Sequence, residues 1–330
     1  MVKAAIIGCG AWGTTLAKVL GENGHSVNIW CHSAEIAAQI NARENKNLLP
    51  GIVLPEQIRG VTDLPQALNG ARLVVLVTAS QYYRQTAEKI KNLLPPDCLI
   101  ISATKGLDEI TGKRMSEVLY ETLPAYKENI AVLSGPNISR EIAEQKISTA
   151  VIAAQNKKTA ETLQKLLNNS YFRVYTNDDV IGTEIGGTVK NIIAIAAGIV
   201  DGLNLGNNTK AALLVRGMVE IARLAVCLGG KSETIFGLTG MGDLITTCSS
   251  NLSRNHYVGV ELAKGKPLKE ILQGMQAVAE GVPTTKLIYA LALKTKTPMP
   301  ITEQIYGILY ENKPISATLN ELMTRTLKPE

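Results

Sequence analysis

Lys190 is the residue whose surroundings in the sequence suggest chemistry most clearly. It stands near the start of an apolar helical pattern, G-G-T-V-K-N-I-I-A-I-A-A-G at 186–198, which only Lys190 and Asn191 interrupt. Burial disfavours a charged ammonium, so a lysine on such a helix must be paired or have a lowered pKa. Either condition suits a proton-transferring group. A side chain that reaches the surface is the alternative interpretation.

A second group of candidates follows at 238–255. Asp243 is the single acid in L-T-G-M-G-D-L-I-T-T-C, and Arg254 lies between Ser253 and Asn255 just before a helical pattern. A guanidinium, a hydroxyl, an amide and a helix N-terminus can together bind a phosphate group. The simpler alternatives are a turn or cap residue for Asp243 and a surface ion pair for Arg254.

The N-terminal stretch 4–13 has the pattern of a dinucleotide site. Four apolar residues are followed by Gly8, Gly10 and Gly13 with the spacing G-x-G-x-x-G, and a helical pattern comes next. Gly8 allows the chain to turn, Gly10 lets the backbone approach a pyrophosphate, and Gly13 lets the helix pack against the strand. A buried strand with a glycine-rich turn is the alternative.

The end of the second predicted strand, V-N-I-W at 27–30, bears on the choice of cofactor. An acid at this point holds the adenosine ribose 2′-hydroxyl, whereas a base accommodates a 2′-phosphate. Here Cys31, His32 and Ser33 follow, with no acid. NADP is therefore allowed and NAD is not excluded. His32 is the one potentially cationic group nearby, and an exposed polar residue without a role is its alternative interpretation.

Polar residues also follow two further predicted strands. Lys105 comes directly after the strand at 98–103, and Gly135 and Asn137 follow the strand at 130–133. Ligands of open α/β sheets bind at the carboxyl ends of the strands, so these residues are candidates for the same site. A solvated loop lysine and an ordinary turn are the alternatives.

The order of these elements predicts the fold class. Strands are expected at 4–7, 27–30, 73–77, 98–103, 130–133, 148–154 and 172–175, alternating with helices such as 82–94 and 157–167. After residue 177 only helical patterns are prominent, at 182–202, 210–229, 258–264, 268–276 and 284–294. The sequence thus predicts an α/β protein: an N-terminal Rossmann-like doubly wound sheet over 1–177, then an all-helical domain over 178–330.

Composition excludes several classes of function. The 330 residues carry a net charge of +5 without a basic block, so a small anionic ligand fits better than a nucleic acid. The five cysteines include no C-x-x-C and no His/Cys cluster, so we expect no structural disulfide, no metal site and a reduced, cytoplasmic protein. The longest apolar helical run, 192–200, is too short to cross a bilayer, so no membrane insertion is expected.

Taken together, the motifs closely resemble the NAD(P)-dependent glycerol-3-phosphate dehydrogenases of bacterial type. The resemblance covers essentially the whole chain. The motifs that carry it are G-x-G-x-W-G at 8–13, A-T-K-G-L at 103–107, S-G-P at 134–136, G-T-V-K-N at 187–191, G-x-G-D-L at 240–244, S-R-N at 253–255 and M-P-I-T-E at 299–303. Members of this family interconvert dihydroxyacetone phosphate and sn-glycerol 3-phosphate, usually as homodimers that supply phospholipid synthesis.

The resemblance also implies roles for individual residues. Lys190 would exchange the proton at the C2 oxygen, Asp243 would orient it, and Lys105 would lie in the active site. Residues implied to contact the substrate are Lys105, Gly135, Asn137, Lys190, Asp243, Ser253, Arg254 and Asn255. Residues implied to contact NAD or NADP are Gly8, Gly10, Ala11, Trp12, Gly13, His32, Ser33, Lys105, Ser139, Arg254, Val278 and Glu280.

Three positions depart from the family pattern. Ala11 stands where serine is frequent, Ser33 where arginine is frequent, and Ser139 where alanine is frequent. The second departure argues against a strong NADP preference. Two other functions are compatible with a two-domain dinucleotide binder: a hydroxy-acid or phosphogluconate dehydrogenase, and a redox sensor without turnover. The S-R-N and G-x-G-D-L motifs argue against the first, and the candidate proton donors against the second.

Overall fold

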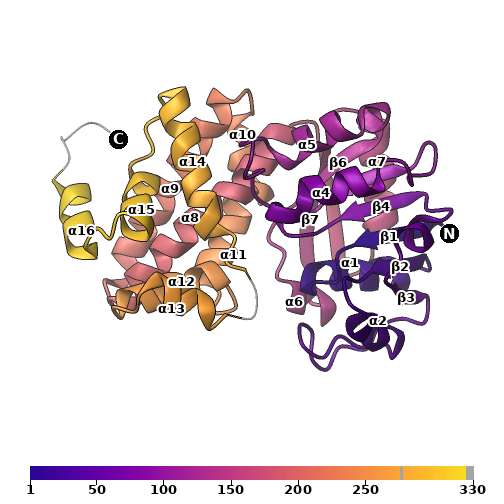
Figure 1. Cartoon of the computed structure of the whole chain (residues 1–330). Coiled ribbons are helices and arrows are strands. Elements are labelled where there is room, and N and C mark those ends of the chain that lie inside the picture. The colour runs from indigo at the N-terminus through magenta and orange to yellow at the C-terminus, as the bar shows by residue number, and fades with distance from the viewer. Residues whose placement is uncertain (276–277, 325–330) are drawn as a thin grey trace. The chain divides into compact units, whose positions relative to one another are not determined.

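The structure, a computed structural model, describes residues 1–275 and 278–324. The chain divides into two compact units, Met1–Glu184 and Ile185–Glu330 (Figure 1). The sequence-based boundary at 177/178 lies in the loop before helix α8 (Val180–Gly202), whereas the units divide within the second turn of that helix. Each unit is described separately below.

Unit 1 is built on an eight-stranded sheet with the strand order β3-β2-β1-β4-β5-β6-β7-β8. The strands are β1 (Lys3–Ile7), β2 (Ser26–Trp30), β3 (Ile58–Val61), β4 (Leu73–Leu76), β5 (Leu99–Ser102), β6 (Ile130–Ser134), β7 (Ser148–Ala154) and β8 (Phe172–Asn177). Neighbouring strands are parallel except for the antiparallel pair β6–β7. The order 3-2-1-4-5-6 confirms the predicted Rossmann-like fold.

Alternation along the strands explains why helices cover both faces of this sheet. Ala4 and Ile6 of β1 belong to one buried cluster, and Ala5 and Ile7 belong to another, because successive side chains point to opposite faces. The helices of this unit are α1 (Ala11–Glu22), α2 (Ala34–Asn41), α3 (Leu64–Leu68), α4 (Ser80–Ile90), α5 (Met115–Thr122), α6 (Ser139–Ala143) and α7 (Lys157–Leu167), with a 3₁₀ turn at Pro124–Asn129. Both sides of the sheet are therefore apolar, as buried parallel strands require.

Among the described residues of unit 2, every regular secondary-structure element is a helix, as predicted. It holds most of α8, then α9 (Gly206–Cys227), α10 (Ser232–Ile235), a π-helical turn at Leu238–Gly242, α11 (Asp243–Ser249), α12 (Arg254–Ala263), α13 (Leu268–Gln273), α14 (Gly281–Thr295), α15 (Pro300–Tyr310) and α16 (Ile315–Met323). The helix expected over 268–276 ends at Gln273, and position 276 lies outside the described residues.

Helix α8 is longer than the apolar run at 192–200 indicates. It spans 23 residues with a mean hydropathy of 1.3 in its most apolar window, so length and composition alone would allow it to cross a bilayer. However, 89% of that window is buried inside the protein. A helix that is apolar on all sides is also typical of the core of a large soluble protein, and α8 fits that description.

The first turns of α8 are fixed to unit 1 by a buried carboxylate. Glu184 accepts hydrogen bonds from Ser116 N at 2.8 Å, from Ser116 Oγ at 2.5 Å and from Arg114 Nη1 at 2.6 Å. Burial raises the pKa of the Glu184 carboxyl, and Arg114 and Ser116 oppose that rise. This clamp joins α8 to the start of α5.

Candidate active site

The glycine-rich turn between β1 and α1 leaves space at the N-terminus of α1. Gly8 has φ +129°, a conformation that L side chains rarely adopt, and a Cβ on Gly13 would overlap the carbonyl oxygen of Gly8. Around Gly10, by contrast, a Cβ would meet nothing within 4 Å. Gly10 is also the N-cap of α1 and has no side chain to accept from the first amides of that helix. The turn is thus tightly packed at Gly8 and Gly13 and unobstructed at Gly10, an arrangement that fits a bound pyrophosphate.

Other polar atoms at the carboxyl edge of the sheet also fit a polar ligand. Thr78 follows β4, Ser134 ends β6, and Asn137 follows it. Among the described residues, Thr78 Oγ1, Ser134 Oγ and Asn137 Oδ1 are buried without a hydrogen-bond partner. Buried polar atoms are normally satisfied, so unsatisfied ones at this edge are consistent with a ligand that completes them.

The structure brings three predicted residues of unit 1 together. Lys105 Nζ donates to the carbonyl oxygen of Gly135 at 3.2 Å. Asn137, two residues further on, is anchored because its Nδ2 donates to the carbonyl oxygen of Thr149 on β7 at 2.9 Å. Lys105 and the turn at 135–137 therefore share one end of the sheet.

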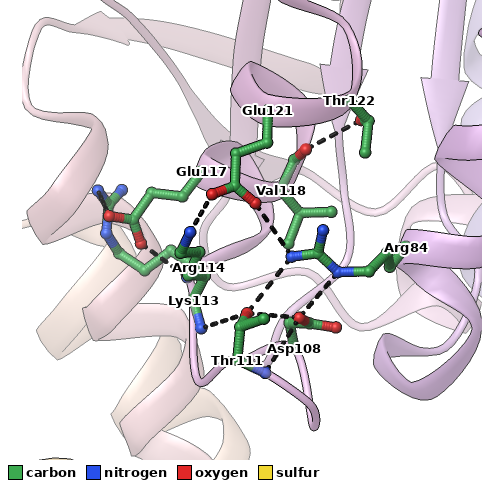
Figure 2. Close-up of polar contacts among 9 residues, drawn as sticks. All are labelled: Arg84, Asp108, Thr111, Lys113, Arg114, Glu117, Val118, Glu121 and Thr122. Atoms are coloured by element: carbon green, nitrogen blue, oxygen red, sulfur yellow. Dashed lines mark hydrogen bonds and ion pairs between the residues drawn. The ribbon is translucent and has the colours of Figure 1, made fainter.

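The loop that carries Lys105 is held down by charged side chains (Figure 2). Asp108 is buried and accepts from Arg84 Nε of α4 at 2.9 Å and from Thr111 Oγ1 at 2.5 Å. Arg84 also donates to Glu121 of α5 at 3.2 Å, and Lys113 pairs with the same carboxylate. The loop is thus tied to two helices, which limits the positions that Lys105 can adopt.

The remaining cofactor candidates of unit 1 follow strand ends or open helices of that unit. His32 is exposed, and Ser33 is the N-cap of α2, where its hydroxyl accepts from Ile36 N at 3.3 Å. Ala11 and Trp12 open α1, and Ser139 opens α6. Ser33 therefore has a structural task that the sequence motif alone did not indicate.

In unit 2, Lys190 forms a compact polar cluster with two side chains of α11. Its Nζ lies 3.0 Å from Asp243 Oδ1 and donates to Thr247 Oγ1 at 2.5 Å, and Thr247 Oγ1 in turn donates to Asp243 Oδ1 at 3.2 Å. The side chains of Lys190 and Asp243 are only 8% and 3% exposed. Lys190 is thus paired rather than directed to the surface.

Helix α8, which carries Lys190, packs closely against α12. A Cβ on Gly198 of α8 would overlap the carbonyl oxygen of His256, and a Cβ on Gly259 of α12 would overlap that of Ile195. Asn255 links the same elements, since its Nδ2 donates to Asn191 Oδ1 at 2.9 Å and its Oδ1 accepts from Gly281 N at 2.9 Å. The predicted substrate residue Asn255 is therefore engaged, through both ends of its amide, in joining α8, α12 and α14.

The Ser-Arg motif starts helix α12. Ser253 is its N-cap and accepts from His256 N at 3.2 Å, and Arg254 is its first residue. The Arg254 side chain is exposed, and its Nη1 donates to the carbonyl oxygen of Val278 at 3.0 Å. Glu280 follows as the N-cap of α14. An exposed guanidinium beside a helix N-terminus is well suited to a phosphate group.

Sequence reasoning missed Thr247 and gave Asn191 no role of its own. Thr247 lies one helical turn after Asp243, a spacing that brings both side chains onto one face of α11. This i, i+4 relation was visible in the sequence but is informative only once α11 is known to start at Asp243.

Among the described residues, no group of three or more His, Cys, Asp or Glu side chains could hold a metal ion.

A dinucleotide-type sheet together with a helical unit that buries a Lys–Asp pair defines a nicotinamide-dependent dehydrogenase. Comparisons with known proteins specify the family. The family model for the N-terminus of NAD-dependent glycerol-3-phosphate dehydrogenase matches residues 3–160, and the model for its C-terminus matches residues 179–320. The chain belongs to the NAD-dependent glycerol-3-phosphate dehydrogenase family.

Individual relatives agree with this family membership. The glycerol-3-phosphate dehydrogenase [NAD(P)+] of Chlorobium phaeobacteroides is 45% identical over 100% of this chain and 99% of the relative. The Bacillus cytotoxicus protein of the same name is 46% identical over 100% and 97%. A crystal structure of glycerol-3-phosphate dehydrogenase from Coxiella burnetii superposes with a TM-score of 0.93 at 37% identity, covering 98% of this chain and 99% of that one.

Proposed function

We propose that the protein reduces dihydroxyacetone phosphate to sn-glycerol 3-phosphate with NADH or NADPH, and catalyses the reverse oxidation. The observation that carries this proposal is the buried cluster of Lys190, Asp243 and Thr247 in a chain of this family. When bound, the nicotinamide supplies the hydride for the C2 carbon. The protein must then stabilise and protonate the oxygen on that carbon.

Lys190 is suited to that task because it is charged, buried and fixed in orientation. As the C2 oxygen gains negative charge, the ammonium stabilises it and delivers a proton. Asp243, 3.0 Å from the ammonium, stabilises its charge, and Thr247 bridges the two groups and restricts rotation of the lysine. In the oxidation direction the neutral amine of Lys190 accepts the proton.

Arg254 and Ser253 are proposed to bind the substrate phosphate. One N–H of Arg254 is occupied by the Val278 carbonyl oxygen, and a guanidinium has five N–H donors in a planar fork. Ser253 accepts from an amide as a cap and keeps its hydroxyl proton for donation. The partial positive charge of the α12 N-terminus adds to the attraction for a dianion.

Most of the residues proposed to hold the dinucleotide belong to unit 1. The turn at 8–13 would receive the pyrophosphate through backbone amides, and His32 and Ser33 would lie near the adenosine ribose. Lys105, Gly135 and Asn137 are proposed to line the reacting end, with Lys105 adding positive charge near the substrate. Ser139, Val278 and Glu280 complete the proposed cofactor contacts.

The experiment is an absorbance assay on the purified full chain. NADH or NADPH should be consumed when dihydroxyacetone phosphate is added, and reduced cofactor should form again from sn-glycerol 3-phosphate and the oxidised cofactor. Free dihydroxyacetone and a three-carbon 2-keto acid serve as controls for phosphate recognition. Turnover of the keto acid in preference to the phosphorylated ketone would contradict the proposed substrate.

We further propose that the enzyme is a cytoplasmic homodimer that supplies glycerol phosphate for phospholipid synthesis. The family resemblance supports all three statements, and the five free cysteines are consistent with a reducing compartment. Light scattering coupled to size-exclusion chromatography would test the dimer. A monomer across the working concentration range would refute it.

A further inference from the structure

Two cysteines that are far apart in the sequence follow neighbouring strands of unit 1. The parallel register pairs Ile7 of β1 with Trp30 of β2. Cys31 is the residue after Trp30, and Cys9 lies two residues after Ile7, inside the glycine-rich turn. Both thiols are free and belong to one buried cluster, with exposures of 5% for Cys9 and 0% for Cys31.

The surroundings of Cys9 favour its thiolate. The neighbouring Cys31 thiol and His32, whose Nδ1 is 3.8 Å from Cys9 Sγ, together outweigh burial and lower the pKa of Cys9 to about 6. The same pairing and burial raise the pKa of Cys31. Cys9 is thus the thiol of the pair that ionises more readily. The Cys31 thiol donates to the Ile29 carbonyl oxygen at 3.7 Å.

We propose that Cys9 and Cys31 form a modification site for hydroperoxides, in which Cys9 is the attacking thiolate and Cys31 the resolving thiol. The Cys9 sulfur attacks the terminal peroxide oxygen, the O–O bond breaks, and Cys9 becomes a sulfenic acid while the leaving oxygen takes up a proton as water or alcohol. Cys31 sulfur then attacks the sulfenic sulfur, the S–S bond forms, and the sulfenic oxygen leaves as water. Two thiols are oxidised by two electrons and one peroxide is reduced.

The geometry permits both steps for a small oxidant. The space above Gly10, next to Cys9, contains no protein atom within 4 Å of a Cβ built there, and His32 on the other side is exposed. Cys9 and Cys31 follow two directly paired strands, and such strands lie about 4.8 Å apart, close to the Cα separations that a disulfide spans. A small hydroperoxide is the class of oxidant suited to a thiol that is only 5% exposed.

The expected consequence is weaker cofactor binding, and this part of the inference rests on the proposed function. Asn45 Nδ2 and Thr14 Oγ1 hold the Cys9 carbonyl oxygen at 3.2 Å and 3.4 Å, so the turn has one well-defined backbone conformation. A disulfide would draw Cys9 toward β2 and distort the amides proposed to receive the pyrophosphate. Bound dinucleotide should in turn cover Cys9 and slow its oxidation.

The test treats the reduced full chain with hydrogen peroxide, blocks remaining thiols with N-ethylmaleimide and identifies peptides by mass spectrometry. A peptide linked through Cys9 and Cys31 should form, disappear with a thiol reductant, and form roughly tenfold faster than any sulfenic acid at the exposed Cys227. Saturating NADH should slow it. These peptide readouts do not depend on substrate turnover, so they remain valid even if the proposed activity is wrong.

Two variants separate the roles of the thiols. Cys31→Ser should stop disulfide formation and accumulate a sulfenic acid at Cys9 that dimedone traps when it is added with denaturant, whereas Cys227→Ser, the matched control on the surface of α9, should behave like the unsubstituted chain. Absence of the linked peptide, or failure of dimedone to label Cys9 in Cys31→Ser, overturns the proposal. Peroxide inactivation that persists unchanged when no linked peptide forms would overturn the proposed effect on cofactor binding.

Discussion

The two units prepare for their ligands in different ways. The carboxyl edge of the sheet in unit 1 offers mainly backbone groups and unsatisfied polar atoms such as Thr78 Oγ1 and Asn137 Oδ1. The cluster in unit 2 is already complete, because Lys190, Asp243 and Thr247 satisfy one another. With the roles proposed above, the cofactor site would rely on shape, and the catalytic site on a charge that is buried and oriented in advance.

The largest expected effect is at the completed cluster. Lys190→Ala removes the proposed proton donor and the ammonium that pairs with the buried Asp243 carboxylate, so kcat should fall by about 10²–10⁴-fold on every substrate. Steady-state kinetics with dihydroxyacetone phosphate measure this. Lys286→Ala, which removes an exposed lysine on α14, is the control and should leave kcat unchanged. A loss that appears only in KM would mean that Lys190 binds substrate without transferring a proton.

A smaller and more selective effect is expected at the entrance of α12. Arg254 is exposed, so its contact with a phosphate should be at the low end for charged pairs, about 2 kcal/mol or roughly thirtyfold in kcat/KM. Arg254→Ala should show this loss for dihydroxyacetone phosphate and little change for free dihydroxyacetone. The cap of α12 is provided by Ser253, so Tm should not move. Equal losses on both substrates would remove Arg254 from the proposed phosphate site.

At the glycine-rich turn, a change of side-chain size alone should weaken cofactor binding. Gly10 has φ −66° and ψ 176°, which alanine adopts freely, and a Cβ there meets no protein atom within 4 Å. Gly10→Ala should therefore keep its Tm but raise the KM for NADH about tenfold, as expected for a methyl group that intrudes on a bound ligand. Gly13→Ala, which would overlap the Gly8 carbonyl oxygen, should lower Tm as well. An unchanged KM in Gly10→Ala would show that the pyrophosphate does not approach this point.

Features that depend on a short local stretch of sequence could be predicted, and features that depend on distant contacts could not. Strands such as β4 and β5 are short apolar runs, and their order with the helices identifies the fold. The strand β3, Ile58-Arg59-Gly60-Val61, was missed because Arg59 and Gly60 interrupt its apolar pattern, and non-local contacts stabilise it: pairing with β2 and two hydrogen bonds between Asn41 of α2 and the backbone of Gly60. The glycine-rich turn could be predicted because its glycines lie within one short stretch of sequence, 8–13.

Long-range contacts of the site could not be read from local patterns. The pairing of Lys190 with Thr247 joins residues on two helices, and the four-residue spacing from Asp243 does not by itself indicate a contact with Lys190. Asn255 lies next to Arg254, yet its amide bridges α8 and α14 instead of standing free. The proximity of Cys9 and Cys31 depends on the register of β1 and β2.

The smallest effect is expected at Ser33, which caps α2 and is also proposed to lie near the adenosine ribose. Ser33 caps α2, so Ser33→Arg should cost about 0.5–2 kcal/mol of stability through loss of the cap. An arginine at this exposed turn would also offer a partner to a 2′-phosphate, which should shift the ratio of kcat/KM for NADPH over NADH by about 1 kcal/mol, roughly fivefold. Ser33→Ala separates the two effects, because it loses the cap without adding charge. It should show the lower Tm with an unchanged cofactor ratio. If Ser33→Ala shifts the ratio as much as Ser33→Arg, the position acts through the conformation of α2 and does not face the 2′-position of the adenosine ribose.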